Sequence, residues 1–263
     1  MAVIIAGHHR SGTSMFRLVC QSHPRVEINR EMGNFLQIDT SWADYRRFMF
    51  QRWWNKRNAS MRSDSTSKAP HPPTEMPRNL ILVLRYLQRI RRHQHGTINA
   101  EIIDRALHDL YPQAEVVGDK FPDYHFQLDR FASDKNLQCV FIYRDPRDVA
   151  ASFVAKTRTV WRAHTDDSVR QPAEIAERWV AAMHRMERTA DRLFIVRYED
   201  FVTNPQPIVK RLGEWLKIDP ALFNTRPIHA ESIGKHRRGL SEQEICDVIE
   251  VAGTTMQLYG YTI

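Results

Sequence analysis

Short runs of apolar, mostly β-branched residues alternate along this chain with longer segments in which apolar residues recur every three or four positions. The short runs are typical of buried parallel strands, and the periodic segments are typical of helices that pack on a sheet. We expect strands at 3–6, 26–28, 115–117, 138–143 and 193–196, and helices between 13 and 23 and at 42–54, 79–92, 101–110, 124–131, 147–154 and 205–216. This alternation predicts an α/β fold, with a parallel sheet flanked by helices on both faces.

The chain of 263 residues is long enough for one core, and no internal repeat divides it. We therefore expect a single domain over residues 1–263. One stretch departs from the pattern, because Ser60 to Pro77 is rich in Ser, Thr, Lys and Pro. That composition predicts a mobile loop.

A glycine-rich turn follows the first predicted strand. The segment Gly7-His8-His9-Arg10-Ser11-Gly12-Thr13-Ser14 has the spacing of a P-loop, in which backbone N–H groups and a helix N-terminus face an anion. Thr13 stands where a nucleoside triphosphatase carries lysine, and a cation stands inside the loop as Arg10. Arg10 suits a shorter anion such as a phosphosulfate, which has one phosphate and a terminal sulfuryl group. Thr13 or Ser14 is expected to cap the helix.

A second cation follows the strand at 138–143, in Arg144-Asp145-Pro146-Arg147-Asp148. Arg144 can make a charge-assisted, bidentate bond to a phosphate, and Ser152 in the next helix can add a hydroxyl. Arg144 can equally pair with Asp145 or Asp148 and cap that helix. Ligands of parallel sheets bind beyond the carboxyl ends of the strands, where both motifs are expected.

The pair of motifs resembles the PAPS-dependent sulfotransferases (PAPS is 3′-phosphoadenosine 5′-phosphosulfate), in particular the tyrosylprotein and bacterial carbohydrate sulfotransferase-like branch. The loop at 10–14 resembles the family's 5′-phosphosulfate loop, and Arg144 with Ser152 resembles its 3′-phosphate motif. Arg197-Tyr198-Glu199-Asp200 and Ser232-Ile233-Gly234-Lys235 resemble the segment after the next strand and the loop that covers the cofactor. The resemblance spans Val3 to about Gly260.

The resemblance implies a sulfotransferase fold and in-line transfer of the sulfuryl group from PAPS to a hydroxyl or amine acceptor. Adenosine 3′,5′-bisphosphate would be the product, and no metal would be required. The implied cofactor-binding residues are Arg10, Ser11, Gly12, Thr13, Ser14, Arg144, Ser152, Tyr198 and Lys235. The resemblance is weak over 41–116, and we expect that segment to form the acceptor side of the cleft. The acceptor can be a carbohydrate, a tyrosine, a lipid or a small metabolite.

Catalytic residues are implied by the tyrosylprotein relatives, in which a base glutamate follows a His-Pro pair and a lysine beside an aspartate stabilises the transferring group. Glu31 follows His23-Pro24 at about that spacing, and Lys120 follows Asp119. Glu31 is thus the implied base, with Lys120 and Arg10 stabilising the developing charge. Glu31 can instead be a surface carboxylate beside Arg30.

Several side chains of the predicted site have a second interpretation. Glu27, His8 and His9 are further candidates for the base, although both histidines can simply pack at the sheet edge. Tyr198 can border the adenine or belong to the core. Lys235 can bind phosphate or be solvated.

The composition agrees with an anionic partner, because the net charge is +7 and the isoelectric point is about 9.5. Two other functions share some of these features: a P-loop nucleotide-dependent phosphotransferase, and a nucleic-acid-binding protein that uses the arginines of 85–92. Three isolated cysteines and the absence of a long apolar run predict a cytoplasmic protein without a transmembrane segment. Contact with nucleic acid is not expected.

Overall fold

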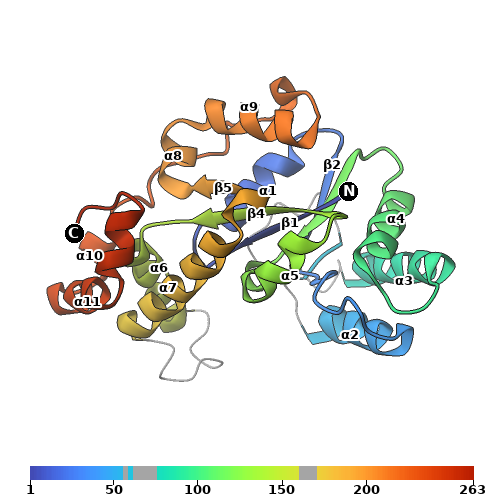
Figure 1. Ribbon diagram of the computed structural model, residues 1–263, viewed down its shortest axis with the longest axis horizontal. Helices are drawn as coiled ribbons and strands as arrows, with labels where there is room; N and C mark the ends of the chain where they lie inside the picture. The colour runs from blue at the N-terminus through green and yellow to red at the C-terminus, as the bar shows by residue number, and fades with distance from the viewer. Residues whose placement is uncertain (56–58, 62–75, 160–170) are drawn as a thin grey trace.

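Five parallel strands run through the centre of the molecule (Figure 1). The computed structural model describes residues 1–55, 59–61, 76–159 and 171–263. The strands are β1 (Ala2–Gly7), β2 (Val26–Arg30), β3 (Val116–Lys120), β4 (Leu137–Tyr143) and β5 (Leu193–Arg197), in the sheet order β2-β3-β1-β4-β5. Lys120 is paired with Arg30 and with Ile5, and Tyr143 with Arg197. The register therefore brings the carboxyl ends of neighbouring strands close together at one edge.

Helices cover both faces of the sheet and bury two separate apolar layers. On one face, Val3 and Ile5 of β1 pack beneath α1 (Thr13–Gln21), α8 (Tyr198–Thr203) and α9 (Pro205–Leu216). On the other face, Ile4 of β1 packs beneath α4 (Ala100–Leu110), α5 (Leu128–Ser133), α6 (Pro146–Thr159), α7 (Pro172–Arg188) and α11 (Glu242–Leu258). Successive side chains of β1 thus point into opposite apolar layers, as expected for a strand buried on two sides.

The remaining α-helices lie toward the ends of the sheet. Figure 1 shows α2 (Trp42–Asn55) and α3 (Met76–His93) beside α4 at one end, and α10 (His236–Gly239) beside α11 at the other. Short 3-10 helices are η2 (Pro122–Gln127), η4 (Ala190–Arg192) and η5 (Pro220–Leu222). None of the described helices combines the length and the apolar character that crossing a membrane requires.

The predicted α/β architecture is confirmed, with three local corrections. The helix expected at 124–131 begins as η2, because Pro122 opens a tight turn and the buried Tyr124 hydroxyl is fixed by Asp119. β3 extends to Lys120, beyond the predicted end of that strand at 117. Neither Thr13 nor Ser14 caps α1, because the N-cap is Gly12. The loop expected at 60–77 falls largely on 62–75, outside the described residues.

Candidate functional site

The carboxyl end of each strand delivers one of the predicted site residues. In sheet order these are Glu31 after β2, Lys120 at the end of β3, Arg10 after β1, Arg144 after β4 and Tyr198 after β5. Because neighbouring strands lie about 4.8 Å apart, these positions follow one another in a row. After β3 the chain crosses to the other side of β1 to form β4, and ligands of such sheets bind where the strand order changes direction. Arg10 and Arg144 lie on either side of that point.

The loop after β1 has an unusual backbone. Arg10 adopts a φ of 71° and Gly12 a φ of 95°, and this left-handed conformation is costly for a residue other than glycine. A Cβ atom on Gly12 would lie 2.3 Å from a ring carbon of Tyr198, so the tyrosine packs directly against the loop backbone. Only glycine fits there.

The loop also has the features of an anion site. Gly12 caps α1 without a side-chain hydrogen bond, and the first turn of the helix contains no acidic residue. No described side chain therefore caps the N–H groups that the helix N-terminus presents to an anion. Ser11 Oγ is buried and has no hydrogen-bond partner among the described residues. A buried hydroxyl of this kind is satisfied when a bound anion accepts its proton.

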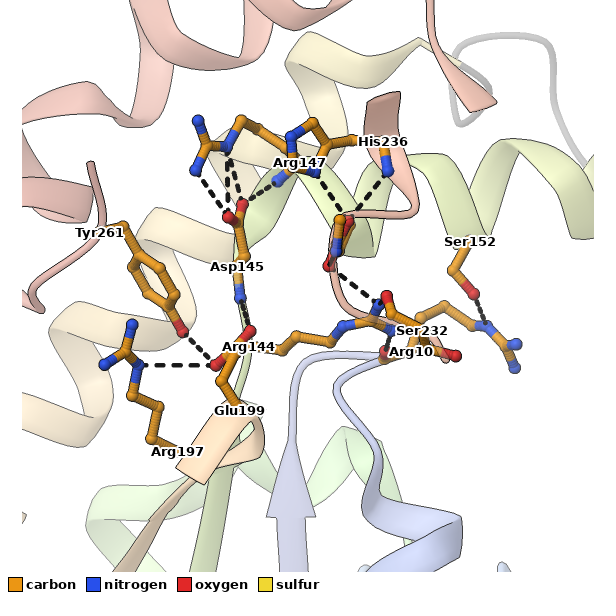
Figure 2. Close-up of polar contacts among 12 residues, drawn as sticks. Arg10, Arg144, Asp145, Arg147, Ser152, Arg197, Glu199, Ser232, His236 and Tyr261 are labelled. Atoms are coloured by element: carbon orange, nitrogen blue, oxygen red, sulfur yellow. Dashed lines mark hydrogen bonds and ion pairs between the residues drawn. The ribbon is translucent and has the colours of Figure 1, made fainter. Parts of the chain in front are cut away.

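Three cationic side chains converge beside the loop. Figure 2 shows Arg10 donating from Nε to Ser152 Oγ at 3.0 Å, and Arg144 donates to the carbonyl oxygen of Arg10 at 3.4 Å. Burial lowers the pKa of Lys235, and the charges of Arg10 and Arg144 lower it further. Burial, followed by the charge of Arg144, also lowers the pKa of Arg10. Like charges gathered in this way are stabilised by an anion placed among them.

Arg144 is almost fully buried and is fixed on several sides. Its guanidinium lies 3.1 Å from the Asp148 carboxylate and 4.6 Å from the centre of the Tyr198 ring, and it donates to the carbonyl oxygen of Ser232. The pairing with Asp148 that the sequence left open is thus present. Arg144 Nε nevertheless has no hydrogen-bond partner among the described residues, so a donor is left for a ligand.

Asp148 has a larger part in the site than sequence reasoning gave it. Its carboxylate accepts hydrogen bonds from Gly234 N at 2.9 Å, His236 N at 2.9 Å and His236 Nδ1 at 2.8 Å. Burial acts to raise the pKa of Asp148, but the N–H groups of His236 and the charge of Arg144 outweigh burial and lower it. Asp148 therefore binds both Arg144 and the loop that carries Lys235, and holds the two together. The spacing of four residues from Arg144 was the available signal.

At the other side of the loop, Lys120 and Glu31 form an ion pair. Lys120 Nζ donates to Glu31 Oε1 at 2.5 Å and to Ser14 Oγ at 3.2 Å, and only 1% of the lysine side chain is exposed. Burial acts to raise the pKa of Glu31, but the charge and the hydrogen bond of Lys120 lower it below its ordinary value. Burial lowers the pKa of Lys120, although Glu31 acts in the opposite direction. Glu31, whose side chain is 28% exposed, is thus held by Lys120 rather than free in solvent.

The turn that carries Glu31 depends on the buried Asp119, which sequence reasoning noted only as the neighbour of Lys120. Glu31 itself has a φ of 54°. The Asp119 carboxylate accepts hydrogen bonds from Met32 N at 3.3 Å, Gly33 N at 2.7 Å, Asn34 N at 3.3 Å and the Tyr124 hydroxyl at 2.6 Å. Arg52 of α2 adds hydrogen bonds to the carbonyl oxygens of Glu31 and Met32. Asp119 and Arg52 are therefore positioning residues for Glu31.

The other candidates for the base lie in different surroundings. Glu27 lies near the start of β2 and accepts a hydrogen bond from Gln21 Nε2 at 2.9 Å. His8 is buried, and burial lowers its pKa to about 3. His9 Nε2 lies 2.5 Å from Asp123 Oδ1. Among the described residues, no group of three or more potential metal-ligating side chains comes together.

Comparison with known proteins gives one family and a set of similar folds. A model described as "Sulfotransferase family" matches residues 2–221. The sulfotransferase domain of the Synechococcus PCC 7002 olefin synthase superimposes with a TM-score of 0.62 at 18% identity, covering 100% of this chain and 95% of that one. The sulfotransferase domain from the curacin biosynthetic pathway gives 0.57 at 15% identity, covering 100% and 98%. Sulfotransferase STF9 from Mycobacterium avium gives 0.50 at 13%, covering 100% and 77%. No curated protein matches the chain.

Proposed function

Because this chain belongs to the sulfotransferase family and is therefore a transferase, we propose that it moves the sulfuryl group of PAPS onto a hydroxyl or amine acceptor. The observation that carries the choice of donor is the convergence of Arg10, Arg144 and Lys235 around a glycine loop with unsatisfied polar groups. PAPS has phosphate groups at two separate positions of its ribose. The two phosphate sites predicted at Arg10 and Arg144 match that requirement.

In this proposal each strand end has a separate task. Arg10, Ser11 and the N-terminal N–H groups of α1 bind the 5′-phosphosulfate, while Arg144 and Lys235 bind the 3′-phosphate. Ser152 ties the two sites together through its hydrogen bond from Arg10. Tyr198, which is only 2% exposed, packs against Gly12 and Arg144 and borders the nucleotide.

The chemical step takes place at the Lys120 end of the row. The acceptor oxygen or nitrogen attacks sulfur in line, the bond between sulfur and the bridging phosphate oxygen breaks, and its electron pair leaves with adenosine 3′,5′-bisphosphate. Glu31, ionised because Lys120 lowers its pKa, takes the acceptor proton. Lys120 and Arg10 stabilise the negative charge that develops on the bridging oxygen. No metal is needed for these roles.

The segment 41–116 is proposed to form the side of the acceptor cleft next to Glu31, while other elements form the opposite side. Arg52 of α2 binds the Glu31 turn, and its guanidinium lies 4.8 Å from the centre of the Phe121 ring. We place the reaction in the cytoplasm, since Cys20, Cys139 and Cys246 are free thiols and the first two are buried. A carbohydrate, tyrosine, lipid or small-metabolite acceptor is compatible with the donor side.

The phosphotransferase and nucleic-acid alternatives are not favoured by the family match. Calorimetry with adenosine 3′,5′-bisphosphate, with and without magnesium, separates the three functions. We expect tight binding that does not depend on magnesium and that excess ATP does not abolish. Preference for ATP with magnesium would instead identify a phosphotransferase. Binding that follows salt alone, without preference for the bisphosphate, would identify a nucleic-acid binder.

A further inference from the structure

A cavity of about 260 Å³ opens beside the proposed transfer end. Its lining comes from the loop after β1, η2, α6 and α7: His8, His9, Asp123, His125, Phe126, Phe153, Ile175 and Arg178. Three of these elements also belong to the proposed donor site. In the loop after β1, His9 is next to Arg10, and in α6, Phe153 is next to Ser152. The third element, η2, begins two residues after Lys120. Burial acts to raise the pKa of Glu31, and the charge and hydrogen bond of Lys120, followed by the charge of His9, act to lower it.

Two neutral imidazoles line the cavity. His125 Nδ1 lies 2.9 Å from the carbonyl oxygen of Pro122, and His8 Nδ1 lies 2.9 Å from that of His9. A carbonyl oxygen only accepts, so each Nδ1 carries the hydrogen and each Nε2 of the neutral ring has a lone pair. Burial lowers the pKa of His125 to about 4 and that of His8 to about 3, so both rings are neutral at pH 7.

One of these acceptors is unsatisfied. His125 is 1% exposed, and its Nε2 has no hydrogen-bond partner among the described residues. Because this ring is neutral and its Nδ1 hydrogen is donated to Pro122, His125 offers neither a positive charge nor an N–H group to an acid in the cavity. The neighbouring Asp123 carboxylate already has a partner in His9. Burial acts to raise the pKa of Asp123, but the hydrogen bond and the charge of His9 outweigh burial and lower it.

The rest of the lining is apolar except for one cation. Phe126, Phe153 and Ile175 supply the apolar surface, and the latter two are almost fully buried. Arg178 is exposed and forms no ion pair with any residue that the structure describes. The volume equals that of about nine water molecules at about 30 Å³ each, so the cavity holds on the order of ten non-hydrogen atoms.

We propose that this cavity binds the acceptor and selects a small apolar hydroxy acid, with its acid group paired to Arg178 and its hydroxyl end directed toward Arg10 and Glu31, where the proton is taken. The proposal rests on the proposed function and names the substrate class for it. The neutral rings of His8 and His125 offer no charge to a carboxylate, whereas Arg178 does, so the two ends of the acceptor are distinguished. An apolar body fills the space between Phe126 and Phe153.

The test compares p-hydroxyphenylacetate with p-hydroxyphenylacetamide, which differ in charge but hardly in size. Binding of each is measured by calorimetry on protein saturated with adenosine 3′,5′-bisphosphate, for the parent and for Arg178→Met, which keeps the apolar stem. We expect the parent to bind the acid about five- to tenfold more tightly than the amide, and Arg178→Met to lose that preference. Arg185→Met is the matched control, because Arg185 lies in the same helix, 5.7 Å from the Phe126 ring, but does not line the cavity.

Three results would overturn the proposal. Equal binding of acid and amide by the parent would show that charge is not recognised, and an acid preference that survives Arg178→Met would place the recognition elsewhere. Binding of neither probe by a protein that binds the bisphosphate would also reject this substrate class. Failure of the parent to bind adenosine 3′,5′-bisphosphate at all is a different outcome, because it removes the proposed donor site.

Discussion

Replacing Arg144 by alanine tests whether the second phosphate site is where we place it. The side chain is 4% exposed, and its Nε is left without a partner among the described residues, so a bound 3′-phosphate would meet a desolvated guanidinium. Losing one charge-assisted contact of this kind costs about 2–4 kcal/mol, which is roughly a 30- to 1000-fold loss of affinity. We expect that loss for adenosine 3′,5′-bisphosphate.

The same substitution should leave the fold in place. Asp148 loses its ion pair with Arg144 but keeps the hydrogen bonds from the backbone of Gly234 and from the backbone and ring of His236. We expect the free energy of unfolding to fall by about 1–3 kcal/mol, with a single cooperative transition. Thermal unfolding without ligand measures this cost separately from the affinity.

Isothermal calorimetry of the parent and two variants completes the test. Arg147→Ala is the matched control, because Arg147 pairs with Asp145 and lies apart from Arg10 (Figure 2). It should change the affinity by no more than about threefold. If Arg144→Ala binds the bisphosphate as tightly as the parent, or if Arg147→Ala weakens binding equally, the assignment of the 3′-phosphate to Arg144 is wrong.

Three further substitutions test the transfer end and the loop. Glu31→Gln should reduce turnover by about 10²–10⁴-fold at saturating PAPS with almost unchanged bisphosphate affinity, and near-parental turnover would exclude Glu31 as the base. Because the pKa of Glu31 is lowered, the acid limb of the turnover profile should have its midpoint below pH 4.5, where Glu31 gains a proton. Because the pKa of Lys120 is lowered, the alkaline limb should have its midpoint below pH 10.5, where Lys120 loses a proton. Lys120→Arg should move the alkaline limb to higher pH, and an unmoved limb would mean that another group titrates. Gly12→Ala should destabilise the protein by about 1–3 kcal/mol more than Gly96→Ala, because both have positive φ but only Gly12 meets the Tyr198 ring; equal thermal shifts would contradict this contact.

The strands could be predicted because buried parallel strands are nearly continuous apolar runs, and β1, β4 and β5 have that character. β3 shows where the rule fails. Its last three residues are Gly118, Asp119 and Lys120, which look like a turn, yet all are buried in the strand. The carboxylate is satisfied by backbone N–H groups from a distant turn, and the ammonium by Glu31. Such compensation arises only when β2 lies beside β3, so local sequence cannot show it.

Two helices were missed although their sequence signals are local. α11 was not predicted, although Ser241 and Glu244 form a capping box whose spacing is readable in the sequence. In α7 the apolar positions, including Ile175 and Trp179, carry the helical period, but the segment was not assigned. In both cases the signal was present and local. These omissions therefore differ from that of β3, which only tertiary contacts explain.

For the site, the sequence predicted residues that belong to linear motifs but not those that act across the fold. Arg10 and Arg144 could be predicted because each follows a strand within a recognisable pattern. The role of Asp148 depends on the loop at 232–236, which is more than 80 residues away in the chain and reaches it only in the folded protein. The cavity that we propose for the acceptor likewise joins four elements that share no sequence pattern.

The central claim is sulfuryl transfer, and the most direct measurement uses PAPS labelled in its sulfuryl group. The protein is incubated with this donor and p-hydroxyphenylacetate without added metal, and the products are separated and identified by mass. We predict that label appears on the acceptor hydroxyl in an amount equal to the adenosine 3′,5′-bisphosphate released, and that Glu31→Gln and Lys120→Ala both slow its appearance. Label that stays on PAPS across a panel of carbohydrate, tyrosine, lipid and small hydroxylated acceptors, while the parent binds the bisphosphate tightly, would contradict the account.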